Sequence, residues 1–192
     1  MNRNEAINIL RTYIHNESLF HHMLSVESVM RFYANKFGES EELWGIVGLL
    51  HDFDYEIHPD LNHHPQNGAE ILREHRVPEE IILSILSHAD HTGIPRDTIL
   101  RKTLYASDEI TGLITACVLV RPSRSIHDLK MSSVKKKWKD KRFAAGANRE
   151  EMLRGAEDLG IDIWDHVSNV ITAMRDIAAD ISLDGPLQGK SN

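Results

Sequence analysis

The residues of this chain that could do chemistry are four histidines and two aspartates dispersed along the sequence. They are His22, the dipeptide His51-Asp52, His64, His88 and Asp108. The dipeptide directly follows the apolar run Trp44–Leu50, where a buried charge without compensation is costly. A bound cation is a common compensation, and imidazole and carboxylate groups together suit Mn, Fe, Co, Ni or Zn. A hydrogen-bonded histidine beside an N-cap aspartate explains an isolated His-Asp pair equally well, so the other four residues are what favour a metal.

Helical spacing predicts where two of these side chains point. His22 shares a helix row with Val26 and Tyr33, so it is expected to face the core. Asp108 lies one turn after Leu104, on the side of its helix that is expected to be buried. Taken singly, each residue could instead be an ordinary buried group with a hydrogen-bond partner.

Apolar residues at three- and four-residue spacing predict a chain that is helical almost throughout. The expected helices cover about 6–14, 18–37, 41–52, 65–72, 78–86, 95–120, 131–138, 148–160 and 163–181. No stretch alternates polar and apolar residues as a half-buried strand would. The fold is therefore predicted to be all-α, with a single domain over residues 1–184. Residues 185–192 are predicted to form a disordered tail.

The composition is that of a globular protein, with 192 residues, 41% of them hydrophobic, and a formal net charge of −7. The single cysteine, Cys117, excludes an internal disulfide and fits a reducing compartment. No apolar segment is long enough to cross a bilayer, and the N-terminus carries no apolar signal region. The protein is therefore expected to be cytoplasmic and to have no membrane partner. The acidic balance predicts that nucleic acid is not a partner. A homodimer stays open.

Histidine is abundant, with 12 residues against 4 tyrosines, and a high count alone does not identify ligands. Five histidines outside the set above are expected on the surface or at helix caps. They are His15, His58, His75, His127 and His166.

The order and context of the six residues resemble a known family. His22, His51-Asp52 and Asp108 match the H…HD…D signature of the HD-domain superfamily of metal-dependent phosphohydrolases. The segment His64–Ala69 resembles the H-P-x-x-G-A element of the two-metal branch of that superfamily, and His88 resembles its next histidine. The resemblance covers about residues 18–119, which would be the core of an HD-domain helical bundle, followed by a helical extension over about 120–184. Residues 134–146 are similar to a group of small predicted HD hydrolases for which no substrate is known.

The resemblance implies a ligand set. His22, His51, Asp52 and Asp108 would hold one divalent ion, and Asp52 would bridge to a second ion held by His64 and His88. Two ions about 3.5–4 Å apart can activate a bridging water and stabilise the attacking and leaving oxygens of a phosphoryl transfer. One or two transition-metal ions are therefore expected as cofactor, and Mg²⁺ stays open.

Catalytic roles are predicted for three residues. Asp52 would bridge the ions, and Asp54 or His91 would relay protons. His91 lies about one helical turn beyond His88, so it could also add a ligand or donate to the leaving group. A histidine at a helix C-terminus before Gly93 is an equally plain interpretation of His91.

A basic segment follows the resemblance. Between Arg121 and Arg142 there are nine Lys or Arg and two Asp, a local charge of +7 that leaves −14 on the remainder. Met131, Val134 and Trp138 are expected to face inward. The cations left free are predicted to bind substrate phosphate, unless they form only a solvated face. They are Lys137, Lys141 and Arg142, with Arg124 in the loop before the helix.

The function that these residues predict is hydrolysis of a small phosphorylated metabolite, a nucleotide or a related phosphoester, by metal-activated hydroxide. The enzyme would be a phosphomonoesterase or phosphodiesterase. Cyclic-dinucleotide phosphodiesterases of the superfamily carry adjacent histidines and a Gly-Tyr-Pro stretch, which this chain lacks. Two alternatives stay open. One is an HD-type di-iron oxygenase, because the same ligands take iron readily. The other is a non-catalytic helical module that binds a metal or a nucleotide.

Overall fold

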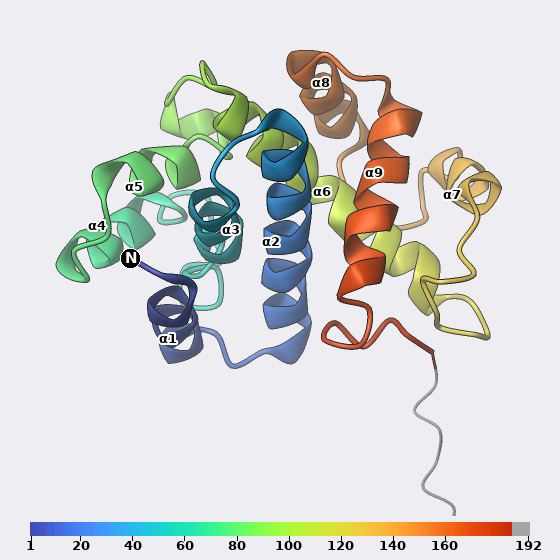
Figure 1. Ribbon diagram of the computed structural model, residues 1–192, viewed down its shortest axis with the longest axis horizontal. Helices are drawn as coiled ribbons and strands as arrows, with labels where there is room; N and C mark the ends of the chain where they lie inside the picture. The colour runs from blue at the N-terminus through green and yellow to red at the C-terminus, as the bar shows by residue number, and fades with distance from the viewer. Residues whose placement is uncertain (186–192) are drawn as a thin grey trace, which may run out of the picture.

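Nine α-helices and one short 3-10 turn form the regular structure of residues 1–185, the part of the chain that the computed structural model describes (Figure 1). The helices are α1 (Arg3–Tyr13), α2 (Glu17–Phe37), α3 (Glu41–Leu50), α4 (Gln66–Glu74), α5 (Glu79–Leu86), α6 (Ile99–Leu119), α7 (Met131–Trp138), α8 (Arg149–Leu159) and α9 (Ile163–Asp176), and the turn η1 covers Asp90–Thr92. The prediction of an all-α single domain is confirmed. Residues 186–192, which make up all of the predicted tail after Gly185, lie outside the described residues.

Capping residues explain where most helices begin and end. The N-cap side chains of Asn16, Ser40 and Asn148 accept hydrogen bonds from backbone N–H groups of α2, α3 and α8. Gly38 and Gly160 end α2 and α8 in the left-handed conformation, with φ of 73° and 74°. The predicted helix boundaries at these points agree with the structure.

Several predicted helix boundaries differ from the structure, among them those of α6, α9 and α3. Helix α6 begins at Ile99 because the Thr98 side chain caps it, so Pro95 and Asp97 precede the helix. Helix α9 ends at Asp176, several residues before the predicted 181. Helix α3 ends at Leu50, because the chain enters a series of turns at His51. The His51 ring donates a hydrogen bond from Nδ1 to the Gly48 carbonyl. His51 and Asp52 therefore lie just beyond the helix rather than within it.

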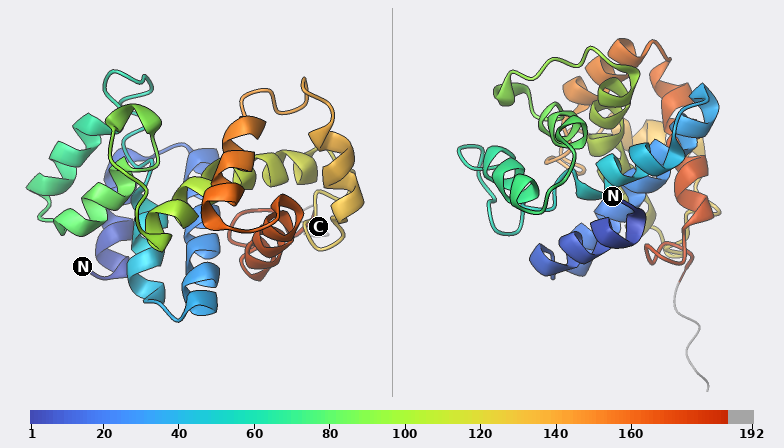
Figure 2. Two further views of the ribbon diagram at one scale, coloured as in Figure 1. Left: turned by 90° about the horizontal axis from the view of Figure 1, so that it is seen from above. Right: turned by 60° about the vertical axis from the view of Figure 1, so that its left-hand side comes forward.

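Helices α2, α3 and α6 carry the site and pack against one another in the centre of the molecule (Figures 1 and 2). Gly48 allows α3 to approach α2 closely, since a Cβ there would lie 3.0 Å from the Val26 carbonyl oxygen. Gly155 does the same for α8 and α6, where a Cβ would lie 2.7 Å from the Ala106 Cα. Helices α4 and α5 lie at one end of the molecule and α7 at the other, and one continuous hydrophobic core joins them.

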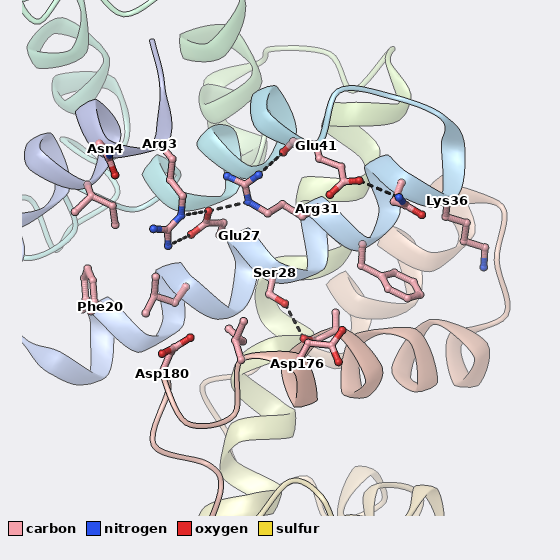
Figure 3. Close-up of a pocket in the computed structure, with 16 residues that line it drawn as sticks. Arg3, Asn4, Phe20, Glu27, Ser28, Arg31, Lys36, Glu41, Asp176 and Asp180 are labelled. Carbon is pink, nitrogen blue, oxygen red and sulfur yellow. Dashed lines mark hydrogen bonds and ion pairs between the residues drawn. The ribbon is translucent and has the colours of Figure 1, made fainter.

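A cavity of about 1030 Å³ lies between α1, α2 and α9, on the face of α2 that carries Phe20, Leu24 and Glu27 (Figure 3). The Glu27 side chain is 5% exposed, and both of its oxygens are bound by the Arg3 guanidinium at 2.6 and 2.9 Å. Arg31 donates a further hydrogen bond to it at 2.9 Å. The one buried carboxylate of this cavity is therefore fully compensated by protein groups.

Candidate metal centre

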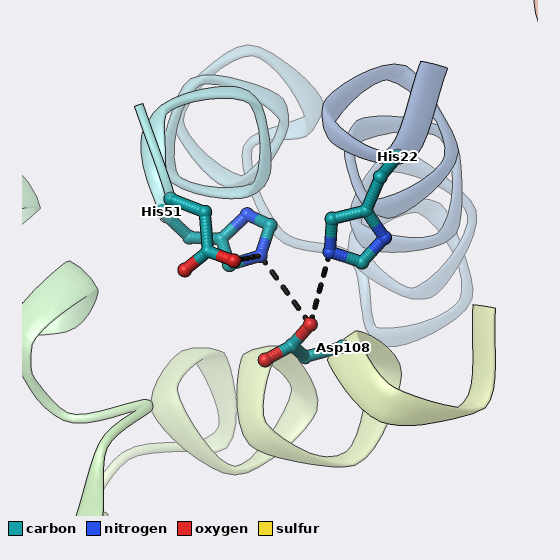
Figure 4. Close-up of side chains that lie close together, drawn as sticks. His22, His51 and Asp108 are labelled. Carbon is teal, nitrogen blue, oxygen red and sulfur yellow. Dashed lines mark hydrogen bonds and ion pairs between the residues drawn. The ribbon is translucent and has the colours of Figure 1, made fainter. Parts of the chain in front are cut away.

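Four of the predicted ligands come together from three helices. His22 lies on α2, His51 and Asp52 follow α3, and Asp108 lies in the middle of α6. Their donor atoms all lie within 4.8 Å of one another. The Oδ1 atom of Asp108 is 3.1 Å from His22 Nε2 and 3.4 Å from His51 Nε2 (Figure 4). Helix packing therefore assembles one group of four potential ligands.

A second group of potential ligands shares Asp52 with the first. It consists of Asp52, His64 from the loop before α4, and His88 from the turn after α5. Asp52 Oδ1 lies 3.2 Å from the Nε2 atom of each histidine, and the two Nε2 atoms are 3.3 Å apart. The six residues predicted as ligands thus form two groups that meet at Asp52.

The four histidines have their Nδ1 atoms bound by acceptors of the protein. The acceptors are Thr111 Oγ1 for His22 (3.3 Å), the Gly48 carbonyl for His51 (2.8 Å), Asp54 Oδ1 for His64 (2.9 Å) and the Ile85 carbonyl for His88 (2.6 Å). A carbonyl or carboxylate only accepts, and the Thr111 hydroxyl already donates to the Asp108 carbonyl, so each ring donates from Nδ1. A histidine that binds a metal is neutral, and with its proton on Nδ1 its lone pair lies on Nε2. Four such lone pairs would face the carboxylates of Asp52 and Asp108, an arrangement that a cation between them would stabilise.

Buried polar atoms without hydrogen-bond partners support the same interpretation. Among the described residues, four buried side-chain atoms have no hydrogen-bond partner: His51 Nε2, Asp52 Oδ1, Asp54 Oδ2 and Arg149 Nε. An unsatisfied buried polar group costs about 1–3 kcal/mol. The first two atoms belong to the group of four or to the group of three, and Asp54 holds the ring of His64. The residues therefore fit a divalent metal, which would satisfy these atoms.

The electrostatics of the cluster favour positive charge. Burial opposes protonation of His64, but the carboxylates of Asp52 and Asp54 outweigh it and raise the pKa of His64 to about 10. Burial likewise opposes ionisation of Asp52, yet His51, His64 and His88 hold the pKa of Asp52 well below its usual range. Carboxylates that stay ionised when buried need positive charge beside them.

Asp54, which is predicted to relay protons, lies behind the ring of His64. It is completely buried, and its Oδ1 atom accepts a hydrogen bond from His64 Nδ1. Gly68 on α4 makes room for it, since a Cβ there would lie 2.5 Å from Asp54 Cγ. Asp54 is therefore placed to orient a predicted ligand, and its proton-relay role stays a prediction.

His91 lies at the mouth of the site. It belongs to η1, separate from α5, and it lines a pocket of about 580 Å³ above the two groups of ligands. Its Nε2 donates to the His64 carbonyl at 3.0 Å, and it belongs to neither group. The predicted catalytic role of His91 thus stays a prediction, and its alternative role as a third histidine ligand of the second ion has no support in this geometry.

The basic residues predicted to bind substrate phosphate do not reach the pocket. Among the described residues, the pocket lining includes none of Arg124, Lys137, Lys141 and Arg142. Helix α7 packs against α6 and α9 at the end of the molecule away from α4 and α5 (Figures 1 and 2). Their binding of substrate phosphate thus stays a prediction, and the structure gives it no support at this pocket, because the inward row of α7 determines which face is buried but not where the helix docks.

The pocket contains residues that the sequence analysis missed. Tyr55 and Leu61 line it from the loop before α4, and Glu109 and Glu151 line it from α6 and α8. Burial first, and then the neighbouring Asp108 carboxylate, raise the pKa of Glu109 to about 7. The position of Glu109 next to Asp108 was the only local signal. Glu151 and the tyrosine become neighbours of the site only through folding.

These features define a class of protein: an all-helical chain with two adjoining His/Asp groups at the base of a pocket, typical of metal-dependent hydrolases. The family model of the HD domain matches residues 19–170. The chain therefore belongs to the HD-domain family, within the superfamily of metal-dependent phosphohydrolases, as its motifs predicted. The family and the cluster together indicate divalent-metal binding.

Two curated relatives are similar to this chain. Ribonuclease Y of Lactobacillus acidophilus (strain ATCC 700396 / NCK56 / N2 / NCFM) is 26% identical over 97 residues, which are 50% of this chain and 18% of the relative. Ribonuclease Y of Latilactobacillus sakei subsp. sakei (strain 23K) is 28% identical over 138 residues, 70% of this chain and 26% of the relative. The chain thus spans about a quarter or less of the length of these relatives. No solved structure matches it significantly.

These relatives overturn one prediction. Nucleic acid was excluded as a partner on the net charge of the whole chain, yet both relatives are named as ribonucleases. The exclusion is wrong because net charge averages over the molecule and does not describe individual surfaces. Among the described residues, no helix is long and apolar enough to span a membrane.

Proposed function

We propose that this chain is a metal-dependent phosphohydrolase that cleaves a phosphoester bond of a nucleotide. The observation that carries the proposal is the convergence of four histidine Nε2 atoms and two carboxylates at the base of a pocket of about 580 Å³. A pocket of this size holds a small molecule. Divalent ions bound there would supply Lewis acidity toward a phosphoryl oxygen and lower the pKa of water.

The residues of the site would have three roles: metal binding, orientation of a ligand and proton transfer. His22, His51, Asp52 and Asp108 would hold one ion, and His64 and His88 with Asp52 would hold a second. Asp54 fixes the ring of His64 through Nδ1. Because Nε2 of His91 donates to the His64 carbonyl, its Nδ1 is the atom that would pass a proton to the leaving group.

Hydrolysis assays with the metal-reconstituted protein under anaerobic conditions test this proposal, with Mn²⁺, Co²⁺, Ni²⁺ or Mg²⁺ restored after chelation. Inorganic phosphate is measured with adenosine monophosphate as the monoester substrate, and p-nitrophenolate is measured with bis(p-nitrophenyl) phosphate as the diester substrate. Asp108→Asn should abolish turnover, whereas Asp176→Asn, in the cavity behind α2, should retain it. Activity that needs iron and oxygen, with oxygen consumed, would replace hydrolysis by the oxygenase alternative.

Hydrolysis of RNA is a second candidate function, favoured by the similarity to the two ribonucleases. On this proposal the basic residues of α7 and its flanking loops would bind the RNA backbone at a distance from the metals. Lys141 and Arg142 are exposed, the latter with 97% of its side chain accessible. Simultaneous replacement of Lys137, Lys141 and Arg142 by Gln should leave hydrolysis of adenosine monophosphate unchanged. It should lower the salt dependence of RNA binding by about two in log–log slope if all three cations contact phosphates.

A further inference from the structure

Exposed apolar side chains gather beside the pocket of the metal centre. Nine large hydrophobic residues are exposed in the described chain, and Tyr55, Ile57 and Leu61 lie within one loop. Tyr55 is 43% exposed and Leu61 is 70% exposed, and both line the pocket. Single exposed apolar side chains are ordinary, but two at the mouth of one pocket make a wall suited to an apolar ligand group.

Core packing does not explain the position of these side chains. Neither Tyr55 nor Leu61 packs against the hydrophobic core, which ends at Phe53 in this part of the chain. The Tyr55 ring meets the His64 ring edge to face, with centroids 5.3 Å apart and an interplanar angle of 84°. Tyr55 is therefore placed directly beside a predicted metal ligand while much of its surface stays accessible.

Other walls of the same pocket are acidic. Glu109 on α6 and Glu151 on α8 line it, and Asn148 connects them. The backbone N–H of Asn148 donates to Glu109 at 3.1 Å, and its side-chain amide donates to Glu151 at 2.6 Å. Carboxylate oxygens accept hydrogen bonds, so these walls suit a ligand group that carries hydroxyls.

We propose that Tyr55 and Leu61 form the subsite that binds the base of a nucleotide, with Glu109 and Glu151 accepting from the sugar hydroxyls. The proposal rests on the proposed function, which places the phosphoryl group at the His/Asp groups. A phosphoryl group, a hydroxylated sugar and a planar base follow one another in a nucleotide, and the pocket offers a matching surface for each. The nucleotide unit is either a free nucleotide or the terminal residue of an RNA strand.

Comparison of substrates with and without a base tests the subsite. Loss of an aromatic stacking partner weakens base binding by about 5- to 150-fold. Tyr55→Ala should therefore raise KM for adenosine monophosphate within that range and leave KM for ribose 5-phosphate unchanged. Tyr55→Phe should restore the wild-type KM. Leu61→Ala should show the same selectivity to a smaller degree. Leu119→Ala, a leucine that is 42% exposed at the end of α6, should show none.

A binding measurement separates this subsite from the proposed function. Adenosine carries no phosphate, and its affinity for the metal-loaded protein can be measured by calorimetry. Weaker adenosine binding by Tyr55→Ala, with metal content unchanged, supports the subsite even if no phosphoester is cleaved, which would defeat only the proposed function. An equal effect of Tyr55→Ala on adenosine monophosphate and ribose 5-phosphate, or no effect on either, would overturn the subsite.

The same variants distinguish the two sources of the nucleotide. A lower KM for adenosine monophosphate than for a ten-residue RNA, with both raised by Tyr55→Ala, assigns the subsite to free nucleotides. The reverse order assigns it to the terminal residue of RNA. A Tyr55→Ala effect on neither substrate contradicts the proposal.

Discussion

Two buried histidines of this protein, His51 and His166, have opposite environments. Both are completely inaccessible to solvent. His166 accepts from the Tyr33 hydroxyl at Nδ1 (2.6 Å) and donates to the Ala106 carbonyl from Nε2 (2.8 Å). His51 donates from Nδ1 to the Gly48 carbonyl, but its Nε2 faces carboxylates and has no hydrogen-bond partner among the described residues.

The difference distinguishes a structural histidine from a proposed metal ligand. Burial outweighs the hydrogen bond to the Ala106 carbonyl and lowers the pKa of His166 to about 4, so the ring stays neutral with both nitrogens satisfied. Burial also acts against a charge on His51, yet Asp52 and Asp108 outweigh it and raise the pKa of His51. A ring with one nitrogen fixed by a carbonyl and the other left facing carboxylates is prepared for a cation. Each prediction below tests whether these two environments have different consequences.

Replacement of each histidine by alanine should give the largest difference between the two environments, in both stability and metal binding. His166→Ala leaves a cavity and removes the partners of Tyr33 and Ala106, so it should lower the free energy of unfolding by about 3–4 kcal/mol and leave metal binding intact. His51→Ala should abolish metal binding and destabilise the metal-free protein less, because it also removes an unsatisfied nitrogen. Denaturant titration in chelator and elemental analysis measure both effects. A metal-free protein that loses more stability from His51→Ala would contradict the comparison.

Acid should destabilise the protein through His166. An unfolded histidine has a pKa of about 6.5, whereas folded His166 has a pKa of about 4, so the unfolded chain binds more protons between these values. The stability from the neutral ring is complete above pH 6.5 and is lost as the pH falls to 4. The loss amounts to about 3 kcal/mol. Urea titrations of metal-free wild type and His166→Gln from pH 7 to 4 measure the difference, and equal slopes would disprove it.

Metal removal should lower stability through the His/Asp groups that contain His51 and not through His166. A ligand present at a hundred times its dissociation constant stabilises the folded state by about 2.7 kcal/mol. Addition of Mn²⁺ or Co²⁺ to the chelated protein should therefore raise its melting temperature. The same addition to Asp52→Ala should have no effect, whereas Tyr33→Phe, which disturbs only the His166 environment, should retain the full increase. A rise in Asp52→Ala equal to that of wild type would place the metal elsewhere.

The smallest expected effect concerns the residue that orients His64. Gly68→Ala places a Cβ against the Asp54 carboxylate and should displace it from His64 Nδ1. Loss of such a partner typically weakens metal binding by about 10- to 100-fold. Gly146→Ala is the control, because a Cβ there has open space around it and Gly146 does not line the pocket. Metal titration by calorimetry compares the two, and equal affinities would show that Asp54 does not position the ligand.

The sequence predicted the helices and the members of the two ligand groups, because both depend on local signals. Apolar spacing determines which face of α2 carries His22, and the HD and H-P-x-x-G-A motifs identify residues by their immediate neighbours. The end of α3 was less predictable, since it depends on the contact between the His51 ring and the Gly48 carbonyl.

Predictions that depended on packing between distant elements were weaker. His166 was expected on the surface or at a helix cap, because its neighbours in the sequence do not indicate that Tyr33 and Ala106 are its partners. The basic residues of α7 and its flanking loops were expected near the metals because their charge can be read from the sequence. The docking of α7 against α6 and α9 cannot be read in this way. Tyr55 lines the pocket because of the fold of the loop before α4, which no local pattern in the sequence indicates.

The metal content of Asp52→Ala tests the central claim most directly, because Asp52 is the residue that the two groups share. Elemental analysis of protein loaded with Mn²⁺ or Co²⁺ and freed of excess ion gives the number of ions per chain for wild type, Asp52→Ala, His64→Ala and the control Asp176→Ala. The account predicts bound metal in wild type and in the control, none in Asp52→Ala, and loss of only the second ion in His64→Ala. An unchanged metal content in a folded Asp52→Ala protein would contradict the assignment of the metal centre.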